Sequence, residues 1–156
     1  VKWLRCSWIV SMSIVIGRFI LIGFLTRKDS KMNRNEKVWL YCRVARDDKA
    51  ALENQEKRLI DFAGKKGYAI AGVSKDTGSG LTMERPGWKE VEQAITAHQV
   101  GAVLAINSSR IARNTVELLA CAERLHRQGV QLVTESDGNI GKMRVAMYMR
   151  LAQEER

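Results

Sequence analysis

Short apolar runs alternate with longer stretches of helical spacing along most of this chain. Apolar runs predict strands at residues 38–44, 69–75, 102–106 and 130–134. Apolar positions three or four apart predict helices at residues 50–66, 88–99 and 114–128, and Gly67 and Gly129 follow two of them as stop signals. Strands and helices that alternate through short links predict an α/β domain, with helices on both faces of a mostly parallel sheet of four to five strands.

Residues 140–156 have the spacing of a last helix that is apolar on more than one face. One face carries Ile140, Met143, Met147 and Leu151, and the others carry Val145, Ala146 and Met149. Such a helix either packs on the sheet domain or pairs with a partner helix, for which flexible methionines are well suited. We therefore expect a folded domain at residues 37–139 and the start of a dimerisation helix at residues 140–156, which would form a homodimer or higher oligomer.

The stretch from Cys6 to Leu25 is apolar and has basic residues on both sides. Its 20 residues would span a bilayer. Arg18 lies within it and costs about 2.5 to 3.5 kcal/mol on an insertion scale, which brings insertion close to break-even. No small-residue cleavage site follows, and this disfavours a cleaved signal peptide. Three interpretations of residues 1–31 stay open: a membrane segment, a packed helix, or an extension upstream of a start at Met32.

The composition is that of an ordinary globular domain, with 46% hydrophobic and 28% charged residues among 156. The net charge of +9 is unevenly distributed, because six of the 26 Lys and Arg but one of the 17 Asp and Glu lie in residues 1–31. The remainder is mildly basic. A nucleic-acid ligand must therefore be argued from the placement of particular arginines.

Cysteines and histidines are few and widely spaced. They are Cys6, Cys42, Cys121, His98 and His126. No CxxC pair is present, so we expect no metal site and no disulfide framework, but reduced thiols in a cytoplasmic protein. No Walker A or GxGxxG motif follows a strand, and we expect no cofactor.

Polar side chains gather where the predicted strands end. They are Arg43 after the first strand, Asp76 and Ser79 after the second, and Ser109, Arg110 and Arg113 after the third, with Arg85 in the intervening loop at residues 76–87. The carboxyl ends of parallel strands meet at one edge of a sheet, where ligands bind. Arg110 and Arg113 are three residues apart, so one helical turn would point both the same way. Four guanidinium groups at one edge predict an anion site.

Five separated motifs resemble, in order and spacing, the catalytic domain of the serine recombinases, the resolvase and invertase family. They are Tyr41-Cys42-Arg43-Val44, Leu52-Glu53-Asn54-Gln55, Asp76-Thr77-Gly78-Ser79-Gly80 with Glu84-Arg85-Pro86 behind it, Ser109-Arg110-Ile111-Ala112-Arg113-Asn114, and Ala152-Gln153-Glu154-Glu155-Arg156. The resemblance covers residues 37–156 and implies a resolvase-like fold, a DNA partner and site-specific recombination.

The resemblance also implies a chemistry for these residues. In that family a serine hydroxyl attacks a DNA phosphodiester without a metal, leaving a 5′-phosphoserine bond and a free 3′-hydroxyl, and arginines neutralise the charge at phosphorus. At the matching positions, Arg43, Arg85, Arg110 and Arg113 would hold the scissile phosphate. Gln55, Asp76 and Ser79 would organise the pocket.

Two positions depart from the family pattern. The nucleophilic serine is matched by Ala45, which has no hydroxyl, and the aspartate before the paired arginines is matched by Ser109. We therefore expect a homologue that binds DNA but does not cleave it.

The family's further DNA-binding region would follow the long helix. Since the sequence given stops at Arg156, we expect sequence-independent, salt-sensitive DNA affinity. The alternatives are a non-enzymatic dimerisation partner that regulates an active recombinase, a decayed mobile-element remnant, and a membrane-tethered protein.

Overall fold

A five-stranded sheet in the order β2-β1-β3-β4-β5 organises the computed structural model, which describes residues 36–81, 84–141 and 153. The strands are β1 (Lys37–Val44), β2 (Ala69–Thr77), β3 (Ala102–Ala105), β4 (Gln131–Thr134) and β5 (Gly138–Asn139). β1 pairs in parallel with β2 and β3, and β3 pairs in parallel with β4. β5 pairs antiparallel with β4, so the sheet is mixed and mostly parallel.

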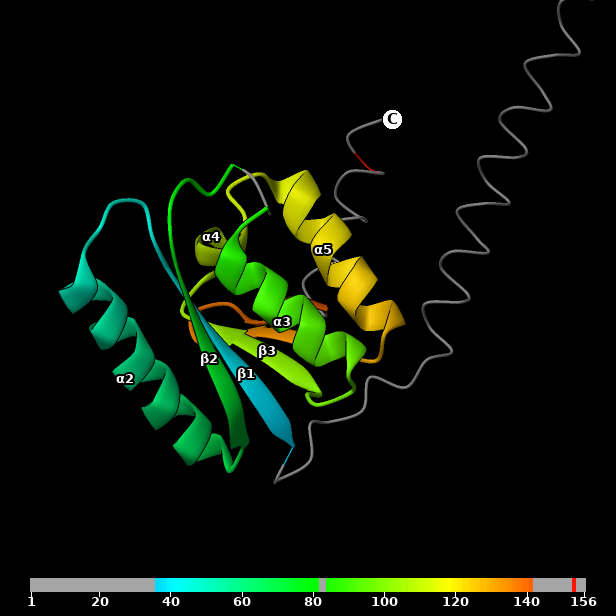
Figure 1. Ribbon diagram of the computed structural model, residues 1–156. Helices are drawn as coiled ribbons and strands as arrows, with labels where there is room; N and C mark the ends of the chain where they lie inside the picture. The colour runs from blue at the N-terminus through cyan, green and yellow to red at the C-terminus, as the bar shows by residue number, and fades with distance from the viewer. Residues whose placement is uncertain (1–35, 82–83, 142–152, 154–156) are drawn as a thin grey trace, which may run out of the picture. The chain divides into compact units, whose positions relative to one another are not determined.

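Helices cover both faces of the sheet, as expected. They are α2 (Lys49–Lys66), α3 (Pro86–Thr96), α4 (Ser108–Ile111) and α5 (Thr115–Arg127). In Figure 1, α2 lies beside β2 on one side, and α3 and α5 lie on the other. An ion pair between Glu92 of α3 and Arg124 of α5, 2.7 Å from oxygen to nitrogen, joins the latter two helices.

Alternation along β1 and β3 divides the core between the two faces. Tyr41 and Val103 belong to one buried cluster with the apolar sides of α3 and α5. The intervening residues, such as Leu40 and Leu104, are equally buried and point to the opposite face, because successive strand residues alternate in direction. This alternation explains why Tyr41 and Arg43 share a face.

Local signals mark the helix ends, and Gly67 acts as the predicted stop. Asp48 caps α2 by accepting from the Ala51 N–H at 2.9 Å, and Gly67 ends the helix with a φ of 74°. Asn114 caps α5 in the same way, accepting from the Val116 N–H. Asp48 and Asn114 therefore mark where the loops at the carboxyl edge of the sheet end and the helices begin.

Several predicted boundaries were wrong. β2 extends to Thr77, so Asp76 lies in the strand and not in a loop. α3 begins at Pro86, whose fixed φ suits the first helical position, and ends at Thr96 instead of residue 99. α4 and β5 were not predicted, because four and two residues are too short to show a period.

Other predictions fall on residues outside the described ranges. They concern residues 1–31 and the predicted dimerisation helix beyond Gly141. Among the residues that are described, none of the helices has the length and apolarity needed to cross a bilayer.

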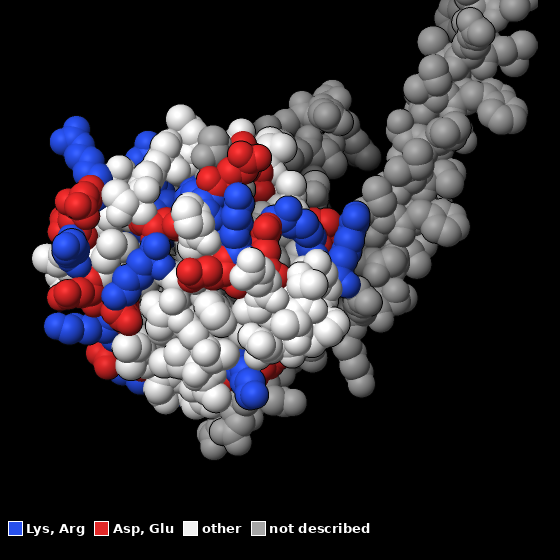
Figure 2. Space-filling model, viewed as in Figure 1, with Lys and Arg blue, Asp and Glu red and all other residues white. Residues whose placement is uncertain are grey.

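The surface around α2 carries charges of both signs. Figure 2 shows basic and acidic side chains mixed over that side of the molecule. The ion pair between Lys75 and Glu56 is one example, with 2.6 Å between nitrogen and oxygen. Because this surface has no single sign of charge, it is a poor candidate for binding a polyanion.

Candidate functional site

The ends of β1, β2 and β3 meet at one edge of the sheet, and the predicted site residues gather there. Arg43 near the end of β1 is in register with Asp76 of β2. The loop after β3 leads into α4, which contains Ser109 and Arg110. The parallel topology therefore brings Arg43 together with residues that are 33 to 67 positions further along the sequence.

Arg43 is almost completely buried, with 1% of its surface exposed. Its guanidinium donates from Nε to the Arg110 carbonyl at 2.9 Å, from Nη1 to the Gly78 carbonyl at 2.6 Å and from Nη2 to the Ser109 carbonyl at 2.8 Å. Desolvation by burial lowers the pKa of Arg43, and repulsion from Arg85, Arg110 and Arg113 lowers it further. The side chain thus joins three strand ends inside a cluster of positive charge.

Gln55 of α2 holds the backbone of Arg43. Its Oε1 accepts from the Arg43 N–H at 3.2 Å, and its Nε2 donates to the Arg43 carbonyl at 3.0 Å. The N–H and carbonyl of Arg43 are buried and need hydrogen-bond partners. The Gln55 side-chain amide supplies bonds of the kind that a neighbouring strand would otherwise make. Gln55 therefore ties the end of β1 to α2.

Asp76 joins β2 to the start of α3. Its carboxylate accepts from the Tyr41 hydroxyl at 2.9 Å and from the N–H groups of Gly87 and Trp88 at 2.8 and 3.0 Å. A Cβ on Gly87 would lie 2.8 Å from a carboxylate oxygen of Asp76, so glycine is needed for this approach. The negative charge also suits the N-terminus of a helix.

Arg85 precedes α3 and points into the protein. Its Nη1 donates to the Tyr41 hydroxyl at 2.7 Å and its Nη2 to the Ile111 carbonyl at 3.0 Å. The Nε is buried without a hydrogen-bond partner. Tyr41 therefore lies between Asp76 and Arg85, and burial raises its pKa well above the usual value.

Arg110 and Arg113 do not share a helical turn as we expected. α4 ends at Ile111, and Ala112 is extended, with φ −144° and ψ 144°. Arg110 is half-buried and donates from Nη1 to the Arg43 carbonyl at 3.3 Å, while its buried Nε has no partner. Arg113 is exposed, and its backbone N–H donates to the Gly80 carbonyl at 3.2 Å.

The remaining predicted residues lie at the surface of this edge. Ala45 is exposed directly after β1, and Ser79 and Ser109 are exposed as well. The Ser79 Oγ accepts from the Leu81 N–H, and the Ser109 Oγ donates to Asn107 Oδ1. The edge thus combines buried arginines with exposed small side chains.

Sequence reasoning assigned no role to Tyr41 or to the carbonyl groups of α4. Tyr41 could have been found, because strand alternation places it on the same face as Arg43. The backbone carbonyl groups of α4 could not have been found, because every residue has one and no sequence pattern indicates which of them will accept from an arginine.

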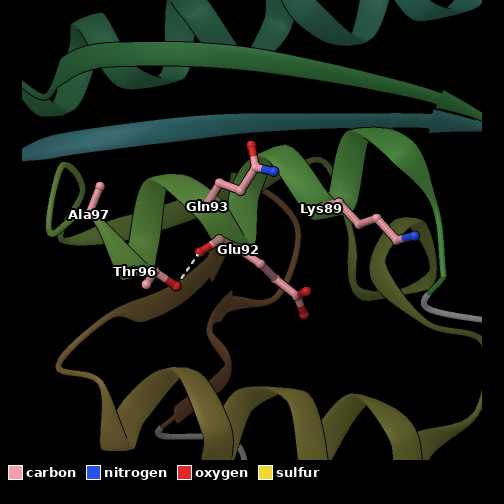
Figure 3. Close-up of a pocket in the computed structure, with 5 residues that line it drawn as sticks. All are labelled: Lys89, Glu92, Gln93, Thr96 and Ala97. Atoms are coloured by element: carbon pink, nitrogen blue, oxygen red, sulfur yellow. Dashed lines mark hydrogen bonds between the residues drawn. The ribbon is translucent and has the colours of Figure 1, made fainter.

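The described residues contain no group of three His, Cys, Asp or Glu able to hold a metal ion. A shallow pocket of about 570 Å³ lies farther along α3, lined by Lys89, Glu92, Gln93, Thr96 and Ala97 (Figure 3). Its lining has none of the arginines at the strand ends.

The family model described as Resolvase, N terminal domain matches residues 38–156. No curated protein matches the chain at a significant level. The crystal structure of the N-terminal catalytic domain of TP901-1 integrase has a TM-score of 0.67 and 20% identity, and the match covers 78% of this chain and 97% of that one. At this identity the similarity supports the fold alone.

Two solved structures are more similar in sequence. A resolvase family site-specific recombinase from Streptococcus pneumoniae is 27% identical, with a TM-score of 0.63 and coverage of 78% of this chain and 89% of that one. The C-terminal catalytic domain of ISC1926 TnpA, an IS607-like serine recombinase, is 30% identical, with a TM-score of 0.59 and coverage of 63% and 69%.

Proposed function

Because this chain belongs to the resolvase N-terminal domain family, we propose that it is a serine recombinase catalytic domain that binds a DNA phosphodiester but does not cleave it. The family assignment supports a role in site-specific recombination. The loss of cleavage rests on the residue at position 45.

The observation that carries the proposal is the arginine cluster at the strand ends, together with Ala45 directly after β1. Arg43 and Arg110 exchange hydrogen bonds at the strand ends, and burial, together with weaker repulsion from the other arginines, lowers the pKa of Arg43. A bound phosphate would relieve that repulsion, and guanidinium groups bind phosphate oxygens well. Ala45 is exposed two positions after Arg43, where the family's nucleophile would stand.

The chemistry of position 45 explains the proposed defect. A serine there would form an oxygen–phosphorus bond while the 3′-oxygen of the DNA departs, and arginines would stabilise the charge at phosphorus. A methyl group forms no such bond. Ser109, which replaces the family's aspartate, supplies no carboxylate for proton transfer. Loss of an essential nucleophile lowers a rate by on the order of 10⁶-fold.

A suicide DNA substrate tests this proposal. The chain, fused after residue 156 to a DNA-binding domain of known site, is incubated with DNA nicked beside the cleavage position and run on a denaturing gel. We expect no covalent adduct with the natural residues, and an adduct with Ala45→Ser combined with Ser109→Asp. An adduct formed by the natural chain and lost with Ser79→Ala would refute the proposed defect. A failure of the double variant would refute an intact pocket.

We also propose pairing through residues 140–156, as the apolar faces of that segment suggest. Native mass measurement of the full chain tests it. Dimers that persist after Met143→Glu and Met147→Glu would exclude this surface.

A further inference from the structure

Two large apolar side chains are exposed at the carboxyl edge of the sheet. Leu81, in the loop after β2, has 64% of its surface exposed, and Val116, in the first turn of α5, has 71%. Among the described residues, the other large apolar side chains at the surface are Ile60 and Ile70, which are less exposed, at 43% and 41%. Single exposed apolar residues are common, so the meaning of this pair depends on its placement.

Leu81 and Val116 belong to two segments that meet beside Arg113. The Arg113 N–H donates to the carbonyl of Gly80, the residue before Leu81, at 3.2 Å. Asn114, the residue after Arg113, accepts from the Val116 N–H at 2.9 Å. Figure 1 shows the loop after β2 and the start of α5 at the same end of the sheet. We call Leu81 and Val116 the apolar flank, because they adjoin this exposed arginine of the strand-end cluster.

The hydrophobic core does not use the apolar flank. The buried side of α5 carries Leu118 and Leu125. Val116 is two positions before Leu118, a rotation of about 200° around the helix, so it faces away from the core. Leu81 is held by its backbone, because its N–H donates to Ser79 Oγ at 3.2 Å. Polar replacements of the apolar flank should therefore leave the free energy of unfolding nearly unchanged.

A protein partner fits this surface poorly. Stable protein interfaces take about 20 to 30 residues from each side, and their cores are depleted of charge. The apolar flank offers two side chains, and the exposed Arg113 lies next to both segments that carry them. A ligand for this surface must therefore combine negative charge with small apolar faces.

A DNA strand combines these two features. Its phosphates are separated by the apolar faces of sugars and bases, with one nucleotide for about 3.4 Å of helix axis along each strand. A phosphate bound at the arginine cluster would bring its two neighbouring nucleotides next to the apolar flank. Aliphatic side chains contact the methyl group of thymine, and leucine can insert between base steps.

We infer that Leu81 and Val116 form an apolar contact surface for the nucleotides on either side of the bound phosphate. The inference rests on the proposed function, which supplies the phosphate at the arginine cluster. It adds a component of DNA affinity that does not depend on salt. Neutralising phosphates releases counterions and so weakens as salt rises, whereas burying apolar surface releases none.

Salt titrations of DNA affinity separate the apolar flank from the charges. The full chain and its variants bind a short duplex of arbitrary sequence, and the logarithm of the affinity is plotted against the logarithm of the salt concentration. We expect Leu81→Asn combined with Val116→Thr to weaken binding about five- to tenfold at every salt concentration, with the slope unchanged. Both replacements keep the approximate size of the side chain and make it polar.

Two further variants serve as controls. Ile60→Thr makes the same kind of change at an exposed position of α2 and should leave the affinity unchanged. Leu81→Met keeps the apolar flank apolar and should bind within about twofold of the natural chain. Urea unfolding of the double variant should coincide with that of the natural chain, which shows that any loss of affinity arises at the surface.

Each alternative outcome identifies what has failed. Equal affinities of the natural chain and the double variant would overturn the inference and leave the proposed function standing. A weaker affinity with a changed slope would overturn it as well, because the charges would then be disturbed. If native mass measurement shows that the double variant loses dimers present in the natural chain, the apolar flank binds a second copy and the inference is wrong. No duplex binding by the natural chain would refute the proposed function and the apolar contact together.

Discussion

Gln55 donates to and accepts from the backbone of Arg43, with 3.0 Å to the carbonyl oxygen and 3.2 Å from the N–H nitrogen. This relationship makes a polar residue of α2 part of the sheet edge. It explains why glutamine is buried among the apolar residues Leu52 and Leu59. The site is therefore held from both layers of the fold, by Gln55 on one side and by the start of α3 on the other.

Replacing Gln55 with alanine should lower the free energy of unfolding by about 2 to 4 kcal/mol. The change leaves the buried Arg43 N–H without its Gln55 partner, which costs about 1 to 3 kcal/mol, and removes one of two bonds to the Arg43 carbonyl, worth about 1 kcal/mol; the carbonyl keeps the bond from Arg110 Nη1 at 3.3 Å. Urea denaturation measures the difference. Asn54→Ala, at the exposed neighbouring position, should change the free energy by less than about 0.5 kcal/mol. Equal effects of the two variants would contradict the assignment.

Tyr41→Phe should destabilise the domain by about 1 to 3 kcal/mol while keeping the ring packed on Trp88. The two rings meet edge to face with 5.1 Å between centroids, and this contact survives the change. The lost hydroxyl deprives Arg85 Nη1 and Asp76 of a buried partner. Thermal or urea unfolding gives the value, with Tyr68→Phe as the control at a half-buried position. A loss no greater than that of the control would exclude a role for the hydroxyl.

Two glycine substitutions should have opposite effects. Gly80→Ala places a methyl group against Arg43 and Arg113, so we expect lower stability and faster exchange of the Arg113 amide. Gly64→Ala lies in α2 with nothing within 4 Å of the new Cβ, so we expect stabilisation of about 0.5 to 1 kcal/mol. Unfolding curves of the pair provide the comparison, and a stabilising Gly80→Ala would show that the loop does not pack on the arginines.

Stability should fall between about pH 9 and pH 11 because of two buried thiols. Burial raises the pKa of Cys42 and of Cys121 from 9.0 to about 11. The folded state therefore retains protons that the unfolded state releases. The stabilisation is complete below about pH 9 and is lost as the pH rises through about 11, on the order of 1 to 3 kcal/mol for each thiol.

Urea midpoints measured across this pH range test the thiol prediction. Cys121→Ala should reduce the fall, because one of the two titrating groups is removed. The raised pKa of Tyr41 acts in the same direction at still higher pH. A pH dependence that is identical in the natural chain and the variant would show that Cys121 does not contribute.

Much of the fold was predictable because its signals are local. The buried run of β1, the caps Asp48 and Gly67 and the spacing within α5 each depend on residues within a few positions of one another. The order of strands and helices then restricts the sheet to a mostly parallel one, and this places Arg43, Asp76 and Arg110 at one edge. Local pattern was insufficient for β5 and α4, because each spans only about one period of its own kind and so shows no repeat.

The sequence by itself determined which residues reach the carboxyl edge of the sheet, and that position 45 carries only a methyl group. Only the tertiary structure decided which way each guanidinium points. Arg43 bonds to carbonyl groups 66 and 67 residues away, and Arg85 to one 26 residues away. Backbone carbonyls are the same at every position of a chain, so no side-chain pattern can indicate which of them a buried arginine will meet; the packing of three strand ends around it makes that choice.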